Sequence, residues 1–517
     1  MSFNLASRTT NAILAILFVV LATVVGTCLY RLCFHPYAKY PGPFLARITN
    51  FYAAYQAWTG KIHVDMWQCH ERYGPIVRYG PDRILVNSAK AVTDLYGFKT
   101  PVIKSTAYDA LVHKAPNILT LRERQLHGSR KRVLSQALSD SNIKAFEPAI
   151  ISKICKFVHV LRSLPQSALE PKGGWSEAID MARWCDYLTF DIMTSMVFSG
   201  DYDMLGEGQY RPAIQAIVDS NVRMGTLFQY PSLRRWKLHE KFFPAAITAR
   251  GVFLKFVTLL VSTRMGLQKG QDKPSNDVFA FMAKAKDPQT GQGLSSRELA
   301  AECTTLIVAG SDTTSTAIAG TLFYLAKHPQ YLQQARAELQ AQFSRASEIE
   351  LGNSLSRCKL LAACINEAMR LAPPAGASMW REATADGVMV DEVYVPKGYD
   401  VGVGIYSLHH SAEHFPQPFA YRPERWLQTE EGQETRQSAR EAAVAAYMPF
   451  SRGPRSCIGK GIANAELMLT LATVIWTLEW RFAPGSEPDE QENFELLDHV
   501  TGAKQGPVLQ FRASGLD

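Results

Sequence analysis

A ten-residue run near the end of the chain, FSRGPRSCIG at residues 450–459, contains a side chain well suited to binding a transition metal. Cys457 lies in a glycine-flanked loop, with Arg455 two positions earlier and helix-forming sequence directly after it. Tight turns let backbone N–H groups point at the sulfur, and positive charge or a helix N-terminus favours the thiolate. The pattern F-x-x-G-x-R-x-C-x-G therefore predicts an iron-binding thiolate. The alternative is a buried structural cysteine.

The same run resembles the haem-binding loop of the cytochrome P-450 superfamily. The resemblance implies haem b as the cofactor and Cys457 as the axial ligand of its iron. It also places Phe450, Arg455 and Gly459 around the haem. The implied fold is mainly α: a single large cytochrome P-450-type helical domain with a small β-rich region, plus one N-terminal transmembrane helix. The implied activity is that of a monooxygenase, which uses O2 and reductase-supplied electrons.

A second pattern, AGSDTT at residues 309–314, lies inside a long apolar segment with helical spacing. Glycine in a helix costs about 1 kcal/mol and a buried aspartate is expensive, so a compensating role is expected. Thr313 can return a hydrogen bond to the carbonyl of Ala309, which bends a helix and opens a groove. The stretch is similar to the family's central helix. That similarity implies room for O2 at Ala309 and Gly310, and a proton relay through Asp312 and Thr313. The alternative is a polar patch facing solvent.

Glu367 and Arg370 form an E-x-x-R pair on one face of a predicted helix. Alone, such a pair is an ordinary surface salt bridge of little worth. The resemblance implies more, because family positions matching Glu367, Arg370 and Arg425 form a buried ionic triad. That triad holds the cysteine loop in place, so its role is structural and not catalytic.

Arg381 and Arg455 match family positions that bind the haem propionates, and guanidinium groups suit carboxylates bidentately. A departure appears at residues 126–132 (LHGSRKR), where the family commonly has Trp and Arg four positions apart. This chain offers His127 and Lys131 instead. Whether His127, Lys131 or Arg132 contacts a propionate stays open at this point.

The densest basic cluster of the body lies in the same region and consists of Arg122, Arg124, Arg130, Lys131 and Arg132. It is either a solvated helix face or a docking site for an acidic electron donor. No G-x-G-x-x-G follows a predicted strand, so electrons must come from a separate protein. The resemblance implies NADPH–cytochrome P-450 reductase, with cytochrome b5 as a further donor.

The composition is that of a globular protein, with 517 residues of which 47% are hydrophobic and 20% charged. The net charge of +7 is mild and forms no long stripe, so we expect no nucleic-acid partner. The nine cysteines are scattered without a C-x-x-C pair, which indicates a reducing compartment rather than a disulfide framework.

Residues 12–30 carry no charge and are rich in Ile, Leu and Val. As a helix they would span roughly 28 Å, close to the thickness of a bilayer core. A cleaved signal peptide is the alternative. Basic residues follow the apolar run and put its C-terminal side in the cytoplasm. We therefore expect a membrane anchor over 1–30, a proline-rich hinge over 31–49 and a cytosolic catalytic domain over 50–517. The implied location is the endoplasmic reticulum membrane, crossed once.

The body from residue 50 onward is predicted to be mostly helical, without a linker that divides it. Helical spacing covers 140–164, 176–199, 246–266, 296–327, 328–344, 355–371 and 460–477. Alternating segments predict strands at 76–79, 83–86, 393–403 and 507–512. Two stretches, 100–125 and 201–245, are interpreted as long flexible excursions.

Together these features predict a membrane-anchored haem-thiolate monooxygenase acting on a small hydrophobic molecule. The candidate pocket segments are apolar with few charges: 101–120, 210–232, 304–310, 375–380 and 499–504. Residues 35–44 resemble filamentous-fungal members of the family, which implies a role in secondary-metabolite biosynthesis. One alternative keeps the fold but catalyses desaturation, ring closure or isomerisation. Another is a non-enzymatic haem-binding protein, which would not need the Asp312–Thr313 pair.

Overall fold

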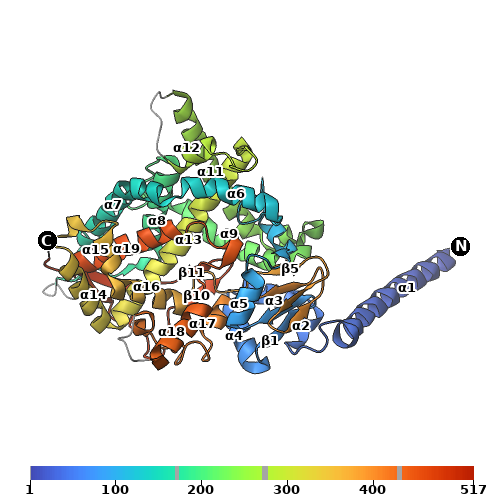
Figure 1. The fold of residues 1–517 in the computed structure, drawn as a ribbon. Helices are drawn as coiled ribbons and strands as arrows, with labels where there is room; N and C mark the ends of the chain where they lie inside the picture. Colours follow the sequence, from blue (N-terminus) through green and yellow to red (C-terminus); the bar gives the residue numbers. More distant parts are fainter. Residues whose placement is uncertain (1, 114, 169–173, 271–276, 428–433, 517) are drawn as a thin grey trace.

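Helices make up most of the computed structural model, which describes residues 2–113, 115–168, 174–270, 277–427 and 434–516 (Figure 1). The α-helices are α1 (Ser2–Leu29), α2 (Phe44–Ile48), α3 (Phe51–Trp58), α4 (Ile62–Tyr73), α5 (Ala89–Tyr96), α6 (Arg124–Ala137), α7 (Asp140–Arg162), α8 (Met181–Phe198), α9 (Arg211–Gln229), α10 (Leu238–Phe242), α11 (Pro244–Gly270), α12 (Val278–Lys284), α13 (Ser296–Lys327), α14 (Pro329–Gln342), α15 (Asn353–Arg357), α16 (Lys359–Leu371), α17 (Ile405–His409), α18 (Glu434–Ala446) and α19 (Lys460–Thr477). The strands are β1 (Ile76–Gly80), β2 (Arg83–Val86), β3 (Val102–Lys104), β4 (Ile179–Asp180), β5 (Arg381–Ala383), β6 (Val388–Val390), β7 (Val393–Val395), β8 (Asp400–Gly402), β9 (Leu478–Phe482), β10 (Leu496–Asp498), β11 (Gly502–Lys504) and β12 (Val508–Ala513).

The long helix α13 runs through the helical body and packs against α8, α16 and α19 (Figure 1). It starts at a capping box, in which Ser295 and Glu298 satisfy each other's backbone N–H groups, and it ends before Pro329. Its later turns are apolar on all sides and are buried in the main hydrophobic core. A helix buried in this way is a rigid support for the polar residues at 309–314.

A five-stranded sheet lies on the N-terminal side of the body, with strand order β1-β2-β8-β5-β3. β2 and β8 pair in parallel, and the other neighbours are antiparallel. In the antiparallel pair β3–β5, Lys104 lies directly opposite Arg381. A three-stranded sheet (β4-β12-β9) and two hairpins (β6–β7 and β10–β11) complete the β structure. The expectation of a mainly helical fold with a small β-rich region is confirmed.

The N-terminal helix α1 stands away from the body (Figure 1). Residues Thr10–Phe34 have a mean hydropathy of 2.8, and none of this stretch is buried against the rest of the protein. It is long and apolar enough to cross a membrane. A second stretch, Pro244–Met265 in α11, passes the same test of length and composition. However, α11 packs against α8 and α9 and buries Phe253 and Leu260, as a helix of a soluble body does.

The predicted hinge over residues 31–49 is attached to the body. Arg78 donates from Nη1 to the carbonyl of Arg31 (2.7 Å), and its backbone N–H donates to Pro41 (2.7 Å). Tyr37 is buried in the core beside the sheet. A Cβ on Gly42 would lie 2.2 Å from the carbonyl oxygen of Arg78, so only glycine permits this approach. The proline-rich segment is thus a docked connector rather than a free hinge.

The two predicted excursions contain more structure than the sequence suggested. Region 201–245 includes α9, a helix of 19 residues, and region 100–125 includes β3 and the 3-10 turn Thr106–Leu111. The prediction of a flexible 201–245 was wrong, because Ala213, Ile214 and Ile217 do follow helical spacing and are buried in the core. Neighbouring Gly, Pro and aromatic residues masked that pattern.

Candidate active site

The loop that carries Cys457 is held by its own backbone. The N–H of Cys457 donates to the carbonyl of Phe450 (2.9 Å), and the N–H of Ser456 donates to Gly453 (3.0 Å). Gly453 adopts φ +68°, and a Cβ there would lie 1.9 Å from the carbonyl oxygen of Tyr96. The glycine is required by both backbone conformation and close approach. Gly459 is the residue before the first turn of α19, so the sulfur lies at a helix N-terminus.

The thiol of Cys457 faces a cavity although it lies deep in the fold. Burial raises its pKa, while the backbone N–H groups of Gly459 and Lys460 and the ammonium of Lys131 lower it in part. The effect of burial prevails, so the pKa of Cys457 lies above its ordinary value and the protein alone does not ionise this thiol. A coordinated metal deprotonates a thiol outright, and the surrounding N–H groups then stabilise the anion.

A large cavity connects the residues that the sequence singled out. It encloses about 1550 Å³ of empty space, part of it open to solvent. Its lining includes these predicted site residues: His127, Lys131, Ala309, Gly310, Thr313, Phe450, Arg455, Cys457 and Gly459. Asp312 and Arg381 are not part of that lining. A flat, mostly apolar macrocycle with one ligated metal suits such a space, because apolar side chains form most of its wall.

Cations gather at one part of this cavity. Lys104, His127, Lys131 and Arg455 line it, and Arg381 lies next to Arg455. Burial lowers the pKa of Lys104 well below its usual range, and Arg381 and Arg455 lower it further. Burial, with Arg455 and Lys104 next, lowers the pKa of His127 to about 2. Burial, with Arg381 and Arg124 next, lowers the pKa of Arg455 to about 10. Basic side chains placed this close, with Lys104 opposite Arg381 in the sheet, disfavour one another's charged forms, and a bound anion would stabilise those charged forms. The two propionates of haem b suit that role.

The three candidates in α6 for a propionate contact, His127, Lys131 and Arg132, have different surroundings in the structure. Arg132 forms a bidentate ion pair with Asp287, with N–O distances of 2.6 and 2.8 Å. His127 and Lys131 line the cavity, and Nζ of Lys131 donates to Pro454 (3.0 Å) and Ser456 (3.2 Å). The structure therefore favours His127 and Lys131 over Arg132.

Arg381 lies just outside the cavity. It lines a small cleft with Arg455, and its Nη1 donates to the carbonyls of Met379 (3.0 Å) and Trp380 (3.2 Å). Its guanidinium also lies 4.9 Å from the ring of Tyr96. From this position Arg381 acts on the cavity through its charge, since it lowers the pKa of both Lys104 and Arg455.

The side chains of Asp312 and Thr313 have different surroundings. Thr313 lines the cavity, and its hydroxyl donates to the carbonyl of Ala309 (2.6 Å), the bond expected from the sequence. Asp312 accepts a short hydrogen bond from the hydroxyl of Thr501, at the turn between β10 and β11. Burial raises the pKa of Asp312, and the ammonium of Lys504 opposes that shift. The pair therefore presents an alcohol to the cavity and an acid behind it.

Gly310 has a packing role in addition to its place on the cavity wall. A Cβ at this position would lie 2.7 Å from Cε of Met193 on α8. The glycine thus allows the close contact between α8 and α13. The same contact includes a hydrogen bond from the Thr189 hydroxyl to the carbonyl of Ser311 (3.0 Å).

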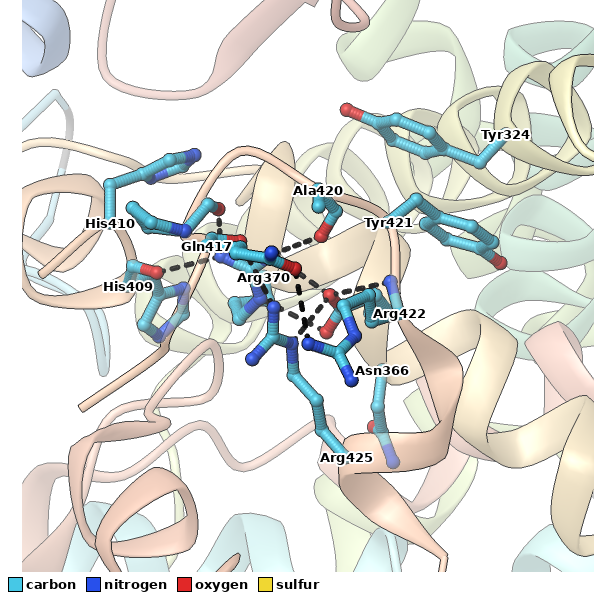
Figure 2. A network of polar contacts seen from close by, with 12 residues as sticks. Tyr324, Asn366, Arg370, His409, His410, Gln417, Ala420, Tyr421, Arg422 and Arg425 are labelled. Atoms are coloured by element: carbon cyan, nitrogen blue, oxygen red, sulfur yellow. Dashed lines mark hydrogen bonds and ion pairs between the residues drawn. The ribbon is translucent and has the colours of Figure 1, made fainter. Parts of the chain in front are cut away.

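Glu367, Arg370 and Arg425 meet as the resemblance implied, inside a larger network (Figure 2). Arg370 donates to both oxygens of Glu367, at 3.0 and 2.8 Å, and Nε of Arg425 donates to the same carboxylate at 3.1 Å. Arg370 also donates to the carbonyl of His409 (2.8 Å), while Nε2 of His409 accepts from the N–H of Met448 (3.0 Å). This chain of bonds links α16 to the segment that enters the cysteine loop.

The basic cluster at 122–132 is largely neutralised within the protein. Arg122 pairs with Asp109 and Glu382, and Arg130 pairs with Glu298 and Glu302. Arg132 pairs with Asp287, and Lys131 is turned toward the cysteine loop. Arg124 is exposed and donates to the carbonyl of Phe98. Paired guanidinium groups offer little charge to an incoming protein, so Arg124 is the member of this cluster best placed to attract an acidic partner.

The comparison with known families agrees with this geometry. The family model described as cytochrome P-450 matches residues 41–507. The chain belongs to the cytochrome P-450 family. It is a monooxygenase with haem b as its cofactor, as members of this family are, and it uses O2, a redox partner and a hydrophobic substrate. The sequence predictions of family, fold, enzyme class and cofactor are confirmed.

Two curated relatives are cytochrome P-450 monooxygenases of filamentous fungi. The protein poxM of Penicillium oxalicum is 45% identical, over 94% of this chain and 92% of its own. The protein atnE of Emericella nidulans is 41% identical, over 94% and 93% respectively. Among solved structures, the haem domain of the cytochrome P-450 called P-450DA matches with a TM-score of 0.73 at 18% identity, covering 92% of this chain and 97% of that one. At that identity the solved structure shows the fold alone.

Three residues of this cytochrome P-450 site were not singled out in the sequence. Lys104 adds a cation to the cavity, Tyr108 accepts from Arg381 at 3.5 Å, and Thr501 binds Asp312. Both 101–120 and 499–504 were expected as pocket segments, so their location was foreseen. The pairing of β3 with β5, which brings Lys104 to Arg381, leaves no local signal in the sequence.

Proposed function

We propose that this cytochrome P-450 is a membrane-anchored haem-thiolate monooxygenase of fungal secondary metabolism in which Cys457 is the axial ligand of the iron. The observation that carries the proposal is the shared cavity: the Cys457 sulfur, the Thr313 hydroxyl and a cluster of buried cations all border it. A thiolate, an alcohol for proton transfer and counter-charges for two propionates are the groups that such an enzyme needs.

The bound haem supplies the activation of O2, which thiolate ligation favours by promoting O–O cleavage. Around it, each side chain has a binding or orienting task. Lys104, His127, Lys131 and Arg455 would hold the propionates, and Arg381 would contribute charge from the adjacent cleft. Phe450 and Gly459 form the floor around the sulfur. Glu367, Arg370 and Arg425 keep the loop in register by tying α16 to the preceding segment.

Protons reach the cavity through Asp312 and Thr313. The Thr313 hydroxyl donates its proton to the carbonyl of Ala309, so its lone pairs are turned to accept a proton, and it passes a proton to the cavity only after the O–H rotates away from that carbonyl. Burial raises the pKa of Asp312, which makes this carboxyl a better proton carrier than an exposed aspartate, and the Thr501 hydroxyl holds it in place. Behind it, Lys504 donates to Asp186 (2.5 Å), whose side chain is 17% exposed. This arrangement gives the relay a supply of protons from solvent.

The substrate is a small to mid-sized apolar molecule. Thr313 and Ala309 share the cavity with the apolar side chains of Ile118, Leu119, Leu306, Ala375 and Met379. Thr305 also borders the cavity, but its hydroxyl is engaged by the amide of Asn117 (2.6 Å) and by Ala301. A wall of this kind selects by shape and apolar contact. The fungal relatives support a secondary metabolite as the substrate.

Electrons come from NADPH–cytochrome P-450 reductase, with cytochrome b5 as a second donor. Residues 1–30 anchor the enzyme in the endoplasmic reticulum membrane, residues 31–49 connect the anchor to the body, and 50–517 form the cytosolic catalytic domain. The apolar, unburied Thr10–Phe34 stretch supports this arrangement, as does the docked connector that follows it.

The full-length chain, co-expressed with a fungal reductase and supplied with polyketide and terpene precursors, tests the function. Under isotopically labelled O2, a converted substrate should carry one labelled oxygen atom. Conversion without label and without O2 consumption would contradict monooxygenation and favour an isomerase. Conversion with O2 consumption but no label in the product would favour desaturation or ring closure.

A further inference from the structure

Basic side chains gather where α9, α11 and the 3-10 turn Pro231–Lys237 pack together. Arg234 in that turn reaches across to the other 3-10 turn, Thr106–Leu111, because its Nη1 donates to the carbonyl of Asp109 (2.8 Å). The basic residues of this region, which we call the α9–α11 cation cluster, are His113, Arg223, Arg234, His239 and Arg250.

The members of the α9–α11 cation cluster are close enough to affect one another's protonation. Although part of His113 is exposed, its pKa falls to about 3. The causes are the loss of hydration and the charges of Arg250, Arg223 and Arg234. Burial and the charge of Arg223 also lower the pKa of Arg250 to about 10. A like charge disfavours the charged form only at short range, so these side chains form one compact group.

Two guanidinium groups of the cluster lack partners. The Nε atoms of Arg223 and Arg250 are buried and have no hydrogen-bond partner among the described residues, and the same holds for Nδ1 of His239. The guanidinium of Arg223 does donate from Nη2 to the sulfur of Met224 (3.6 Å), a weak acceptor. That of Arg250 lies 5.1 Å from the ring of Phe253. Neither contact compensates the loss of water from a charged group.

Buried arginines elsewhere in the body are satisfied within the protein. Nε of Arg83 pairs with the carboxylate of Asp400 at 3.1 Å. Arg78 donates to backbone carbonyls, at 2.7 to 3.2 Å. In the part of the chain that the structure describes, Arg223 and Arg250 have neither kind of partner. Their difference from the other buried arginines needs an explanation.

The nearest acid does not neutralise the cluster. Glu240 on α10 is the one described carboxylate whose charge opposes the lowered pKa values of Arg223 and His239. Its side chain is exposed, and it forms no ion pair with a described residue of the cluster. Guanidinium groups that are desolvated and unpaired favour an external oxyanion, which they bind through two parallel N–H bonds. The cluster therefore suits a carboxylate or a phosphate group.

One layer of apolar side chains separates the cluster from the cavity. Its members are Tyr108, Leu111, Met224, Phe228 and Val500. On one side of the layer, Met224 contacts Arg223. On the other side, Nζ of Lys104, which lines the cavity, lies 5.1 Å from the ring of Tyr108. A molecule with an anionic head and an apolar body fits this succession of cations, apolar layer and cavity.

We propose that the α9–α11 cation cluster binds the oxyanion head, a carboxylate or a phosphate, of an apolar substrate whose body passes through the layer toward the cavity. The role of this molecule as a substrate rests on the proposed function, and the cluster adds a charged group to the substrate class named there.

The surface of an anionic membrane is the alternative source of an oxyanion. A membrane is contacted by outward cations, and Arg235, Lys237 and Lys241 of the same region are exposed. Arg223 and Arg250 differ from these, because their Nε atoms are buried and Arg223 is turned to the apolar layer. This inward orientation favours a small molecule over a lipid surface.

Calorimetric titration of the full-length holoenzyme, in nanodiscs of phosphatidylcholine, tests the site. The probes are dodecanoic acid, dodecyl phosphate and the uncharged methyl dodecanoate, with empty nanodiscs as the blank. At least one of the two acids should bind about tenfold or more tightly than the ester, as expected for hydrogen bonds between charged groups. Equal affinities of the three probes for the wild type would overturn the proposal.

Arg223→Gln and Arg250→Gln should each weaken binding of the acid by about tenfold and leave binding of the ester unchanged. The two residues lie on different helices, so one variant remains if the other does not fold. Arg235→Gln is the matched control, because Arg235 is exposed and its charge does not act on His113, Arg223 or Arg250. Equal effects of Arg235→Gln and the two cluster variants would contradict a specific site.

The haem absorption spectrum reports on the substrate role and is the only readout that rests on the proposed function. Binding of the acid should perturb this spectrum with the affinity that calorimetry gives. Calorimetric binding without a spectral change would place the acid outside the cavity and overturn its role as a substrate. If Cys457 were not the iron ligand, the calorimetric differences between acid, ester and variants would still report on the cluster.

A second set of nanodiscs, containing phosphatidylserine, distinguishes the membrane. The affinity of the wild type for the acid, relative to the ester, should be the same in both kinds of nanodisc. A lower relative affinity in the phosphatidylserine nanodiscs would show that lipid head groups occupy the cluster, and it would overturn the substrate assignment.

Discussion

Thr313 and Asp312 are neighbours in the chain, but their side chains have different tasks. The Thr313 hydroxyl faces the cavity, whereas the Asp312 carboxyl is held behind it by Thr501. Consecutive helical residues point about 100° apart, so one cannot replace the other in contacting a bound ligand. In the proposed relay the alcohol is therefore the last donor to the cavity, and the acid supplies it. Separate substitutions at the two positions should have separable effects.

Thr313→Ala should uncouple electron use from product formation. Haem and substrate binding should persist, because the hydroxyl is bonded only within α13. Coupled turnover should fall by about tenfold or more, since a single proton-transfer group is commonly worth ~10²–10⁴-fold. Product, hydrogen peroxide and NADPH should be measured in one assay. Unchanged coupling would remove Thr313 from the relay.

Thr501→Val should change the pH dependence of coupling. The Thr501 hydroxyl lowers the pKa of Asp312, which burial has raised, so its loss should raise that pKa further. The pH at which Asp312 loses its proton, and the coupling profile that depends on it, should therefore move upward. Thr304→Val is the control, because it removes a hydroxyl from α13, the helix of Asp312, that is bonded to the carbonyl of Ala300. Superimposable profiles for Thr501→Val and wild type would show that Asp312 does not feed the relay.

At the scale of elements, α16 and α19 hold the site in place, and each also contributes apolar residues to the cavity wall, Met369 from α16 and Ile462 from α19. The Glu367 carboxylate on α16 receives hydrogen bonds from five donor groups: two from Arg370 and one each from Arg422, Arg425 and Trp426. This concentration of bonds fixes the segment between α17 and the cysteine loop (Figure 2). His409, the last residue of α17, also accepts a hydrogen bond from the N–H of Met448, and this bond fixes the residues that lead into the cysteine loop.

Glu367→Gln should lower the free energy of unfolding by about 3–5 kcal/mol, because it leaves buried guanidinium groups without their counter-charge. Haem content should fall with it, since the cysteine loop loses its support. Arg345→Ala, which breaks an exposed pair with Glu348, should cost no more than about 1 kcal/mol. Denaturant unfolding and haem quantitation compare the two. Equal costs would contradict a structural role for the triad.

Glu466→Gln should make the protein relatively more stable as the pH rises. Burial raises the pKa of Glu466, a fully buried residue of α19, to about 8 in the folded protein, above its ordinary value of 4.5. The unfolded chain therefore ionises first, and the wild type loses stability as the pH climbs between these values. Glutamine does not titrate and escapes that loss. Unfolding midpoints of both proteins at acidic and mildly alkaline pH should diverge in favour of the variant. Parallel midpoints would contradict the raised pKa.

The elements themselves were largely predictable from local patterns. Long amphipathic or apolar segments such as α7, α13 and α19 follow helical spacing closely and begin or end within a few residues of expectation. α9 was missed because Gly, Pro and aromatic residues around it resemble a loop. The short β3 carries no alternation, since only pairing with β5 defines it.

At the scale of the whole molecule, the connector over residues 31–49 joins the apolar helix α1 to the body. Arg31 forms hydrogen bonds through its main chain and its side chain. Its carbonyl accepts from Arg78, and its guanidinium donates to the carbonyl of Ile48 (2.5 Å). Arg47 reaches back to Leu32 and Ala38 (both 3.4 Å). These contacts make residues 31–49 part of the folded body, while α1 remains outside it.

Truncation at two positions should separate anchor from body. Deletion of residues 1–30 should move the protein from the membrane pellet toward the soluble fraction with its haem retained. Deletion of residues 1–49 should also remove Tyr37 and the Arg31–Arg78 bond, and it should reduce folded, haem-loaded protein. Fractionation and haem content measure both. Loss of haem in the shorter deletion would show that α1 belongs to the fold.

The site was predictable where one short motif carries the chemistry, as at Cys457, and where two residues share a helix face, as at Glu367 and Arg370. It was not predictable where distant segments meet. The gathering of cations at the cavity depends on Lys104 and Arg381 being brought together by a sheet, and the role of Asp312 depends on a turn near the C-terminus. The ion pairs of the basic cluster were not predictable either, because the acidic partners of Arg130 and Arg132 lie far away in sequence.

The ferrous–carbonyl spectrum of purified protein tests the central claim most directly. Ligation by the Cys457 thiolate predicts the strongly red-shifted absorption band of thiolate-bound haem in the wild type, and its loss in Cys457→Ser. Cys364→Ser, which changes a buried cysteine on α16, should keep the band. Retention of the red-shifted band in Cys457→Ser would mean that another residue binds the iron, and it would contradict this account of the site.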